Sequence, residues 1–92
     1  MSTVFEETSY SENVLPLLSH LLQMADDYHR NGSPHQAIEM YYELAERNAE
    51  TPEGKHARSR LVKIAEEYER QGMPHEARSI YEHLLEEKRL VE

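Results

Sequence analysis

The chain repeats itself at an offset of 40 residues, and this duplication constrains its fold more than any other feature. When residues 19–48 are laid over residues 59–88, twelve positions are identical. The identical pairs are Ser19/Ser59, Leu21/Leu61, Ala25/Ala65, Tyr28/Tyr68, Arg30/Arg70, Gly32/Gly72, Pro34/Pro74, His35/His75, Ala37/Ala77, Tyr41/Tyr81, Leu44/Leu84 and Glu46/Glu86. Two unrelated polar helices would not share tyrosine, glycine, proline and histidine in register. The chain is therefore predicted to consist of two copies of one structural unit.

The apolar spacing within each repeat predicts two helices. Intervals of three and four residues place the apolar side chains of a helix on one face, which we expect to meet the core. In the first helices these residues are Leu21, Met24, Ala25 and Tyr28, and their equivalents Leu61, Ile64, Ala65 and Tyr68. In the second helices they are Ala37, Met40, Tyr41 and Leu44, and then Ala77, Ile80, Tyr81, Leu84 and Leu85.

Local signals mark where these helices begin and end. Gly32 and Gly72 stop the first helix of each repeat, since glycine takes the left-handed conformation without a Cβ clash. Ser33 and Thr51 each precede a proline and supply a capping hydroxyl. Pro16 is expected in the first turn of the first helix, where its missing N–H costs little.

The predicted fold class is all-α, with four antiparallel helices forming two helix–turn–helix repeats in a short α-solenoid or bundle. The helices are expected near 14–31, 34–49, 52–71 and 74–90. Residues 1–13 are expected to be a flexible N-terminal lead before a domain over 14–92. Repeat one is placed at 14–50 and repeat two at 51–90.

Composition excludes several classes of protein. The net charge is −8, which disfavours a nucleic acid or an anionic membrane as partner. With no cysteine, neither a disulfide nor a thiolate metal site is available. No apolar stretch is long enough to span a bilayer, and the N-terminus lacks the pattern of a secretory signal. The expected location is therefore the cytoplasm.

Neither catalysis nor metal binding is indicated. The six histidines are His20, His29, His35, His56, His75 and His83, and no two have the i, i+4 spacing that presents both to one ion on a helix. Phosphate-binding glycine loops and nucleophile motifs are absent from the sequence. The chain is thus not expected to be an enzyme, and no catalytic residue, metal or cofactor is predicted.

The repeat resembles the tetratricopeptide repeat, a helix–turn–helix unit that is about 34 residues long in most members of that family. The resemblance covers residues 14–90 and rests on Ala25, Tyr28, Gly32, Ala37, Tyr41 and Leu44, and on Ala65, Tyr68, Gly72, Ala77, Tyr81 and Leu84. The period of 40 residues is longer than the family norm, so the helices are extended by about a turn and the family's superhelical geometry does not transfer.

The resemblance implies a non-catalytic protein-interaction module or adaptor that binds a peptide or a partner helix. The binding surface implied is a concave face lined by the first helices of the repeats. The residues expected on it are Leu22, Asp26, His29 and Arg30 from repeat one, and Val62, Glu66, Glu69 and Arg70 from repeat two. An apolar strip flanked by acids favours a ligand with apolar anchors and basic flanks. Alternatively, Asp26 and Glu66 only solvate an exposed face.

Self-association is the competing hypothesis, in which the chain is a scaffold subunit that forms a homo-oligomer. The first helix has more apolar residues than one core-facing stripe requires. Leu15, Leu18 and Leu22 are left over on this helix, and Tyr42 is left over on the next. These four residues would form the self-association surface, unless residues 1–12 fold back over the strip.

Overall fold

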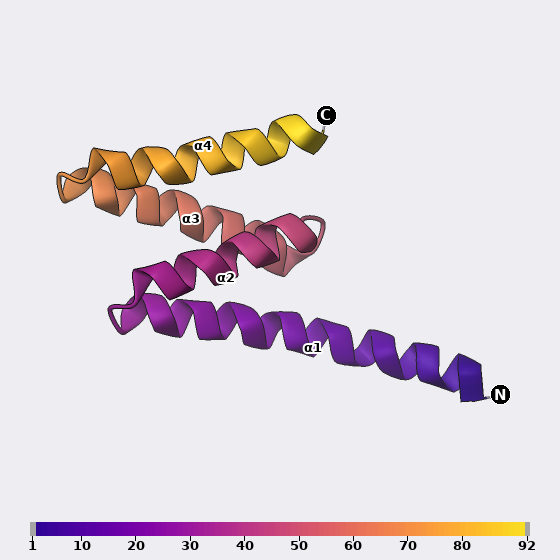
Figure 1. The fold of residues 1–92 in the computed structure, drawn as a ribbon. Helices are drawn as coiled ribbons and strands as arrows, with labels where there is room; N and C mark the ends of the chain where they lie inside the picture. The colour runs from indigo at the N-terminus through magenta and orange to yellow at the C-terminus, as the bar shows by residue number, and fades with distance from the viewer. Residues whose placement is uncertain (1, 92) are drawn as a thin grey trace. The chain divides into compact units, whose positions relative to one another are not determined.

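A computed structural model describes the backbone of residues 2–91 and the side chains of residues 16–86. All regular structure in this part of the chain is helical: α1 spans Ser2–Arg30, α2 Pro34–Arg47, α3 Pro52–Arg70 and α4 Pro74–Val91 (Figure 1). Each connection is a short turn, so the chain reverses direction between successive helices. The predicted all-α helix–turn–helix class is confirmed.

The chain divides within α2 into two compact units, residues 1–40 and residues 41–92. The first unit holds α1 and the beginning of α2. The second unit holds the rest of α2 together with α3 and α4. The sequence-based division into a lead over 1–13 and a domain over 14–92 stays a prediction.

The glycine turns within the two repeats have the same hydrogen bonding. Gly32 has a φ of 84°, and its counterpart Gly72 has a φ of 77°. The Ser33 N–H donates to the Tyr28 carbonyl at 2.9 Å, and the Gly32 N–H donates to the His29 carbonyl at 3.3 Å. The equivalent bonds of the second turn measure 2.8 and 3.1 Å. This Schellman arrangement satisfies the last carbonyls of the helix and needs a left-handed residue, so the predicted glycine stops are confirmed.

The predicted cap at the start of α3 is also confirmed. The Gly54 N–H donates to the Thr51 hydroxyl oxygen at 3.0 Å, and the same hydroxyl donates to the Asn48 carbonyl at 2.7 Å. Pro52 is the first helical residue, where its missing N–H costs little. One threonine side chain thus ties the end of α2 to the beginning of α3.

The start of the first helix differs from the expected one. Helix α1 begins at Ser2 rather than near residue 14, so Pro16 lies inside the helix and not in its first turn. Proline at an interior position has no N–H to donate to the preceding turn, which weakens the helix there without ending it. Residues 2–15 contain neither glycine nor proline, and therefore no residue that would stop the helix.

The core of the second unit surrounds α3. Helix α3 is buried on two sides because it packs against α4 and against the C-terminal half of α2 (Figure 1). The Arg58 guanidinium donates to the Leu84 carbonyl at 3.3 Å and links α3 to α4. The buried apolar residues of this unit are Tyr41, Leu44, Ala45, Ala57, Leu61, Ile64, Ala65, Tyr68, Ala77, Ile80 and Leu84.

Gly54 sets the distance between α2 and α3, a role that the sequence analysis did not assign. Its φ is not left-handed, so conformational freedom is not the reason for glycine here. A Cβ at this position would lie 1.9 Å from the Asn48 carbonyl oxygen and 3.1 Å from the Leu44 carbonyl oxygen. No side chain fits between the end of α2 and the first turn of α3.

In the first unit, the buried face of α1 is not the one expected. Leu18 and Ala25 are buried, whereas Met24 is 36% exposed and Tyr28 is 37% exposed. The expectation that Met24 and Tyr28 lie in the core is therefore wrong. Helix α1 has two adjacent apolar arcs, and the packed arc contains Ala25. Because Ala25 and Ala37 of α2 are both small and fully buried, the two helices can approach closely there.

Candidate partner-binding surfaces

The four residues predicted on the first helix share one side of α1. We call this set, Leu22, Asp26, His29 and Arg30, the α1 partner face. Their i, i+4, i+7 and i+8 spacing brings them to the same side of the helix. Leu22, Asp26 and His29 are partly buried, and Arg30 is exposed. The face therefore presents an aliphatic side chain beside charged and polar groups.

Arg30 has a partner that the sequence analysis did not name. Its guanidinium forms an ion pair with Asp27, one turn earlier on α1. The i, i+3 spacing of the two residues was a usable signal for this pair. Both side chains are exposed, so the pair orients Arg30 more than it stabilises the fold.

The four residues predicted on the third helix have the same spacing. We call this set, Val62, Glu66, Glu69 and Arg70, the α3 partner face. Val62 is partly buried and the other three residues are exposed. On this face an aliphatic residue lies beside two glutamates, with one arginine at the C-terminal end of α3. Each set forms one face of its own helix.

Glu69 is also engaged with α4. The Tyr81 hydroxyl donates to a carboxylate oxygen of Glu69 at 3.3 Å. The pKa of Tyr81 is raised above its ordinary value by desolvation and by the negative charge and hydrogen bond of Glu69. Tyr81 is therefore protonated near neutral pH, and its hydroxyl donates the hydrogen bond that holds the Glu69 carboxylate. This contact positions one carboxylate of the α3 partner face.

An aromatic cluster with one carboxylate joins α2 to α4, and it was not expected from the sequence. The rings of Tyr42 and His83 are stacked, with centroids 3.8 Å apart and an interplanar angle of 22°. His83 also contacts the carboxylate of Glu46, one turn beyond Tyr42 on α2. No sequence signal linked Tyr42 to His83, because their proximity depends on how α2 and α4 lie beside α3.

The residues of the self-association surface proposed from sequence differ in their exposure. Leu18 is 6% exposed and belongs to the core, because it lies on the packed arc of α1 with Ala25. Tyr42 is partly buried and stacked on His83, so it is not a surplus aromatic side chain. Leu22 is partly buried, and the side chain of Leu15 lies outside the described residues.

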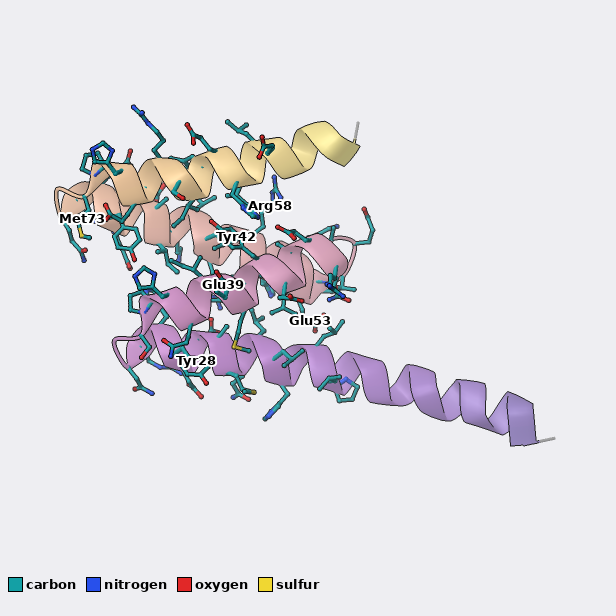
Figure 2. The ribbon with its side chains drawn as sticks, in the orientation of Figure 1. Tyr28, Glu39, Tyr42, Glu53, Arg58 and Met73 are labelled. Atoms are coloured by element: carbon teal, nitrogen blue, oxygen red, sulfur yellow. The ribbon has the colours of Figure 1, made fainter. Side chains whose placement is uncertain are left out.

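A different apolar stripe is exposed on α1. We call Leu17, Leu21, Met24 and Tyr28 the α1 stripe (Figure 2 labels Tyr28). Leu17 is 53% exposed, Met24 and Tyr28 are each more than one third exposed, and Leu21 is partly buried. Three of these residues, Leu21, Met24 and Tyr28, were expected in the core. The spacing identified the stripe correctly, but it could not indicate whether a neighbouring helix covers it.

The histidines are spread over several helices. His20, His35, His56 and His75 are exposed, while His29 and His83 are partly buried. Within the described part of the chain, no three carboxylate or imidazole side chains are close enough together to hold a metal ion. Among the same residues, no helix has the length and apolar composition needed to cross a membrane.

Comparison with known proteins gives one match. The sequence model of a protein family described as the tetratricopeptide repeat matches residues 17–86, which is most of the chain. No curated protein and no solved structure matches the chain. The matched range includes both glycine turns, both partner faces and the α1 stripe.

Proposed function

Because this chain belongs to the tetratricopeptide repeat family, whose members generally mediate protein–protein interactions, we propose that it is a non-catalytic adaptor that binds a peptide or helix of a partner protein. The observation that carries the proposal is the pair of partner faces on the first helices of the two repeats. Each face combines a partly buried aliphatic residue, Leu22 or Val62, with a carboxylate four residues later.

The chemistry of the partner faces favours a ligand with apolar anchors and basic flanks. Leu22 and Val62 offer aliphatic surface at equivalent positions of the repeat. Asp26 and Glu66 lie one turn beyond them, and the whole chain carries a net charge of −8. Opposite charge on the ligand would steer its approach and fix its orientation, while the apolar contacts supply most of the affinity.

The experiment that tests this proposal identifies the ligand by selection. A library of displayed peptides is selected on the immobilised chain, and the affinity of the enriched peptides is measured by fluorescence polarisation. We expect the enriched sequences to combine leucine-like anchors with lysine or arginine. The variant Asp26→Lys with Glu66→Lys should bind these peptides at least tenfold more weakly, which corresponds to about 1.4 kcal/mol.

A matched control reverses the same number of charges elsewhere. Glu39 on α2 and Glu82 on α4 are exposed, and neither belongs to a partner face. The variant Glu39→Lys with Glu82→Lys should bind the selected peptides nearly as well as the wild type. An equal loss in both double variants would mean that net charge alone governs binding, and that Asp26 and Glu66 only solvate the surface.

A self-assembling scaffold subunit is the second candidate function. The exposed α1 stripe favours it, because contiguous apolar residues on a surface helix commonly mark an interface. This candidate differs from the sequence-based hypothesis in its residues, since it uses Leu17, Met24 and Tyr28. It is compatible with partner binding, because the α1 partner face lies on the opposite side of α1.

A further inference from the structure

The α1 stripe has the composition of a surface that another helix covers. Its repeat equivalents in α3 are Ala57, Leu61, Ile64 and Tyr68, which are 0, 0, 2 and 9% exposed. These α3 residues are buried because α3 has a helix on two sides. On α1, Leu17, Met24 and Tyr28 are exposed to solvent and Leu21 is partly buried. The duplication therefore indicates that a helix is the kind of element that fits this surface.

The spacing of the α1 stripe is that of a seam between two long helices. Its residues follow one another at intervals of four, three and four residues, which is the alternation of a coiled-coil heptad. The sequence continues the alternation toward the N-terminus at Val14 and Tyr10, which belong to the same helix. Helix α1 has 29 residues and is the longest helix of the chain.

We propose that the α1 stripe binds the α1 stripe of a second copy of this chain, with the two helices antiparallel. In this arrangement Leu17 lies opposite Tyr28 of the second copy, and Leu21 lies opposite Met24 of the second copy. The contact is self-complementary, because the two-fold axis generates each residue pair twice. The proposal is independent of the partner faces.

Complementary polar groups on the flank favour this partner and register, and Asp27, although it also pairs with Arg30, stays exposed. His20 and Asp27 are exposed and lie along the same edge of the α1 stripe. In antiparallel helices, residues on the same edge of the two seams face each other. The register that pairs Leu17 with Tyr28 therefore sets the His20 imidazole against the Asp27 carboxylate of the second copy, on both sides of the axis. A parallel alignment would place these two edges on opposite sides of the seam, where His20 and Asp27 could not meet.

A second copy could also cover the α1 stripe with its α4 helix, but the charges of α4 oppose this contact. Suppose that α4 of one copy covered α1 of another, as α2 covers α3 within the chain. The positions equivalent by the repeat to Tyr42, Glu46 and His83 would then meet at the contact between the two copies. The equivalent residues there are Glu82, Glu86 and Glu43. Three carboxylates would meet where a tyrosine, a histidine and a glutamate meet within the chain. Head-to-tail stacking is thus disfavoured.

The antiparallel pair would leave the α1 partner face open. The α1 stripe and the α1 partner face lie on opposite sides of α1, about half a turn of the helix apart. A dimer would present two such faces, so a ligand with two binding motifs would gain affinity through effective concentration. The stripe covers on the order of several hundred Å² per copy, which places the dimer among weak, reversible interfaces.

Sedimentation equilibrium of the full chain tests the proposal. We expect a monomer–dimer equilibrium with a Kd of about 1–100 μM. Met24→Glu places two buried charges near the two-fold axis and should weaken the dimer at least tenfold. The control Leu85→Glu changes an apolar residue of α4 that was expected to face the core but is 58% exposed, and it should leave the Kd unchanged. Circular dichroism verifies that both variants keep their helix content.

Two results would overturn the proposal. The first is a strict monomer at about ten times the upper Kd. The second is a dimer that Leu85→Glu dissociates and Met24→Glu does not, since this would assign the contact to α4. Neither result would bear on the adaptor function, because peptide binding is measured separately on the partner faces.

A cross-linking experiment tests the antiparallel register directly. The chain has no cysteine, so single cysteines can be introduced without background. We expect an equimolar mixture of His20→Cys and Asp27→Cys to form the mixed disulfide on mild oxidation, with neither variant alone forming dimers efficiently. A yield of the mixed disulfide no higher than that of either variant alone would contradict the proposed arrangement.

Discussion

Gly54 and Gly32 restrict the chain for different physical reasons. At Gly32 the backbone requires a left-handed conformation, and a Cβ would meet open space. At Gly54 the backbone is ordinary, and a Cβ would collide with the Asn48 carbonyl oxygen. The first restriction is a local conformational preference. The second is a steric limit set by the neighbouring helix, so only the packed structure reveals it.

The two glycines should therefore respond unequally to alanine. Gly32→Ala should lower the free energy of unfolding by about 1 kcal/mol, which is the usual cost of a left-handed residue with a Cβ. Gly54→Ala should cost roughly 3 kcal/mol or more, because backbone atoms and not a flexible side chain must move. Urea denaturation measures both values. A Gly54→Ala variant as stable as Gly32→Ala would refute the close approach of α2 and α3.

The equivalent tyrosines Tyr28 and Tyr68 should also differ. Tyr68 is 9% exposed, and replacing it with alanine should cost about 3–5 kcal/mol, as for other large buried aromatic residues. Tyr28 is 37% exposed, so Tyr28→Ala should cost no more than about 2 kcal/mol in the monomer. Urea denaturation at protein concentrations well below the proposed dimer Kd measures the loss of unfolding free energy of each variant in the monomer. Equal losses would show that the two environments are alike.

The pH dependence of stability follows from Tyr68. Burial, and then the charges of Glu76 and Glu67, raise its pKa above the ordinary value of 10.0. The folded state therefore holds the proton more tightly than the unfolded state. This contribution is fully present below pH 10 and is lost as the pH rises through the folded-state pKa. We expect the urea midpoint to fall above pH 10.

A phenylalanine variant isolates this effect. Tyr68→Phe keeps the ring and removes the titrating hydroxyl, so its urea midpoint should fall less steeply above pH 10 than that of the wild type. Tyr81, whose pKa is also raised, titrates in both proteins and provides the common background. Identical slopes for the two proteins would mean that Tyr68 has the same pKa in the folded and unfolded states.

At the scale of the elements, α2 and α4 are joined by contacts that do not belong to the repeat. The stacked pair Tyr42 and His83 and the contact of His83 with Glu46 connect α2 to α4 within the second unit. The repeat equivalents of these residues are all glutamates, so the cluster is a specific feature of this junction. The cluster thus connects α2 and α4, the two helices that pack against α3.

A double-mutant cycle on Tyr42→Ala and His83→Ala should reveal this coupling. We expect a coupling energy of about 0.5–1.5 kcal/mol, as for other aromatic pairs. The exposed ion pair between Glu43 and Arg47, at 3.3 Å on α2, is the matched control and should couple by no more than about 0.5 kcal/mol. If the losses of unfolding free energy from Tyr42→Ala and His83→Ala were strictly additive, the cluster would not stabilise the fold.

At the scale of the whole molecule, two repeats provide a small core with exposed apolar surface at its first helix. The repeats of such families stabilise one another through the interfaces between neighbours, and three or more are usual. A second copy that covers the α1 stripe would supply one further interface. Self-association and stability are then coupled by mass action.

Thermal unfolding should therefore depend on concentration. The Tm of the wild type should rise by a few degrees between about 1 μM and 1 mM, because the dimer exists only in the folded state. Met24→Glu should have a Tm that is independent of concentration over the same range. Differential scanning calorimetry of both proteins gives the comparison, and a concentration-independent wild type would contradict the coupling.

Much of this fold was determined by the sequence itself. The C-terminal ends of α1 and α3 and the start of α3 followed from Gly32, Gly72 and the Thr51 cap, because these signals act through the backbone of adjacent residues. The duplication and the apolar spacing indicated the all-α class and the family. The spacing also placed the members of each partner face together on one helix. Their binding role stays a prediction.

Only the tertiary structure decided which of two apolar arcs on α1 is buried, and why Gly54 must be glycine. Tyr28 and Tyr68 are the same residue in nearly the same local sequence, yet one is exposed and the other is buried. Local sequence fixes the conformation of a helix, because hydrogen bonds and caps involve neighbours along the chain. Burial depends on which other helices surround it, and a residue has no local signal for a neighbour that is distant in sequence.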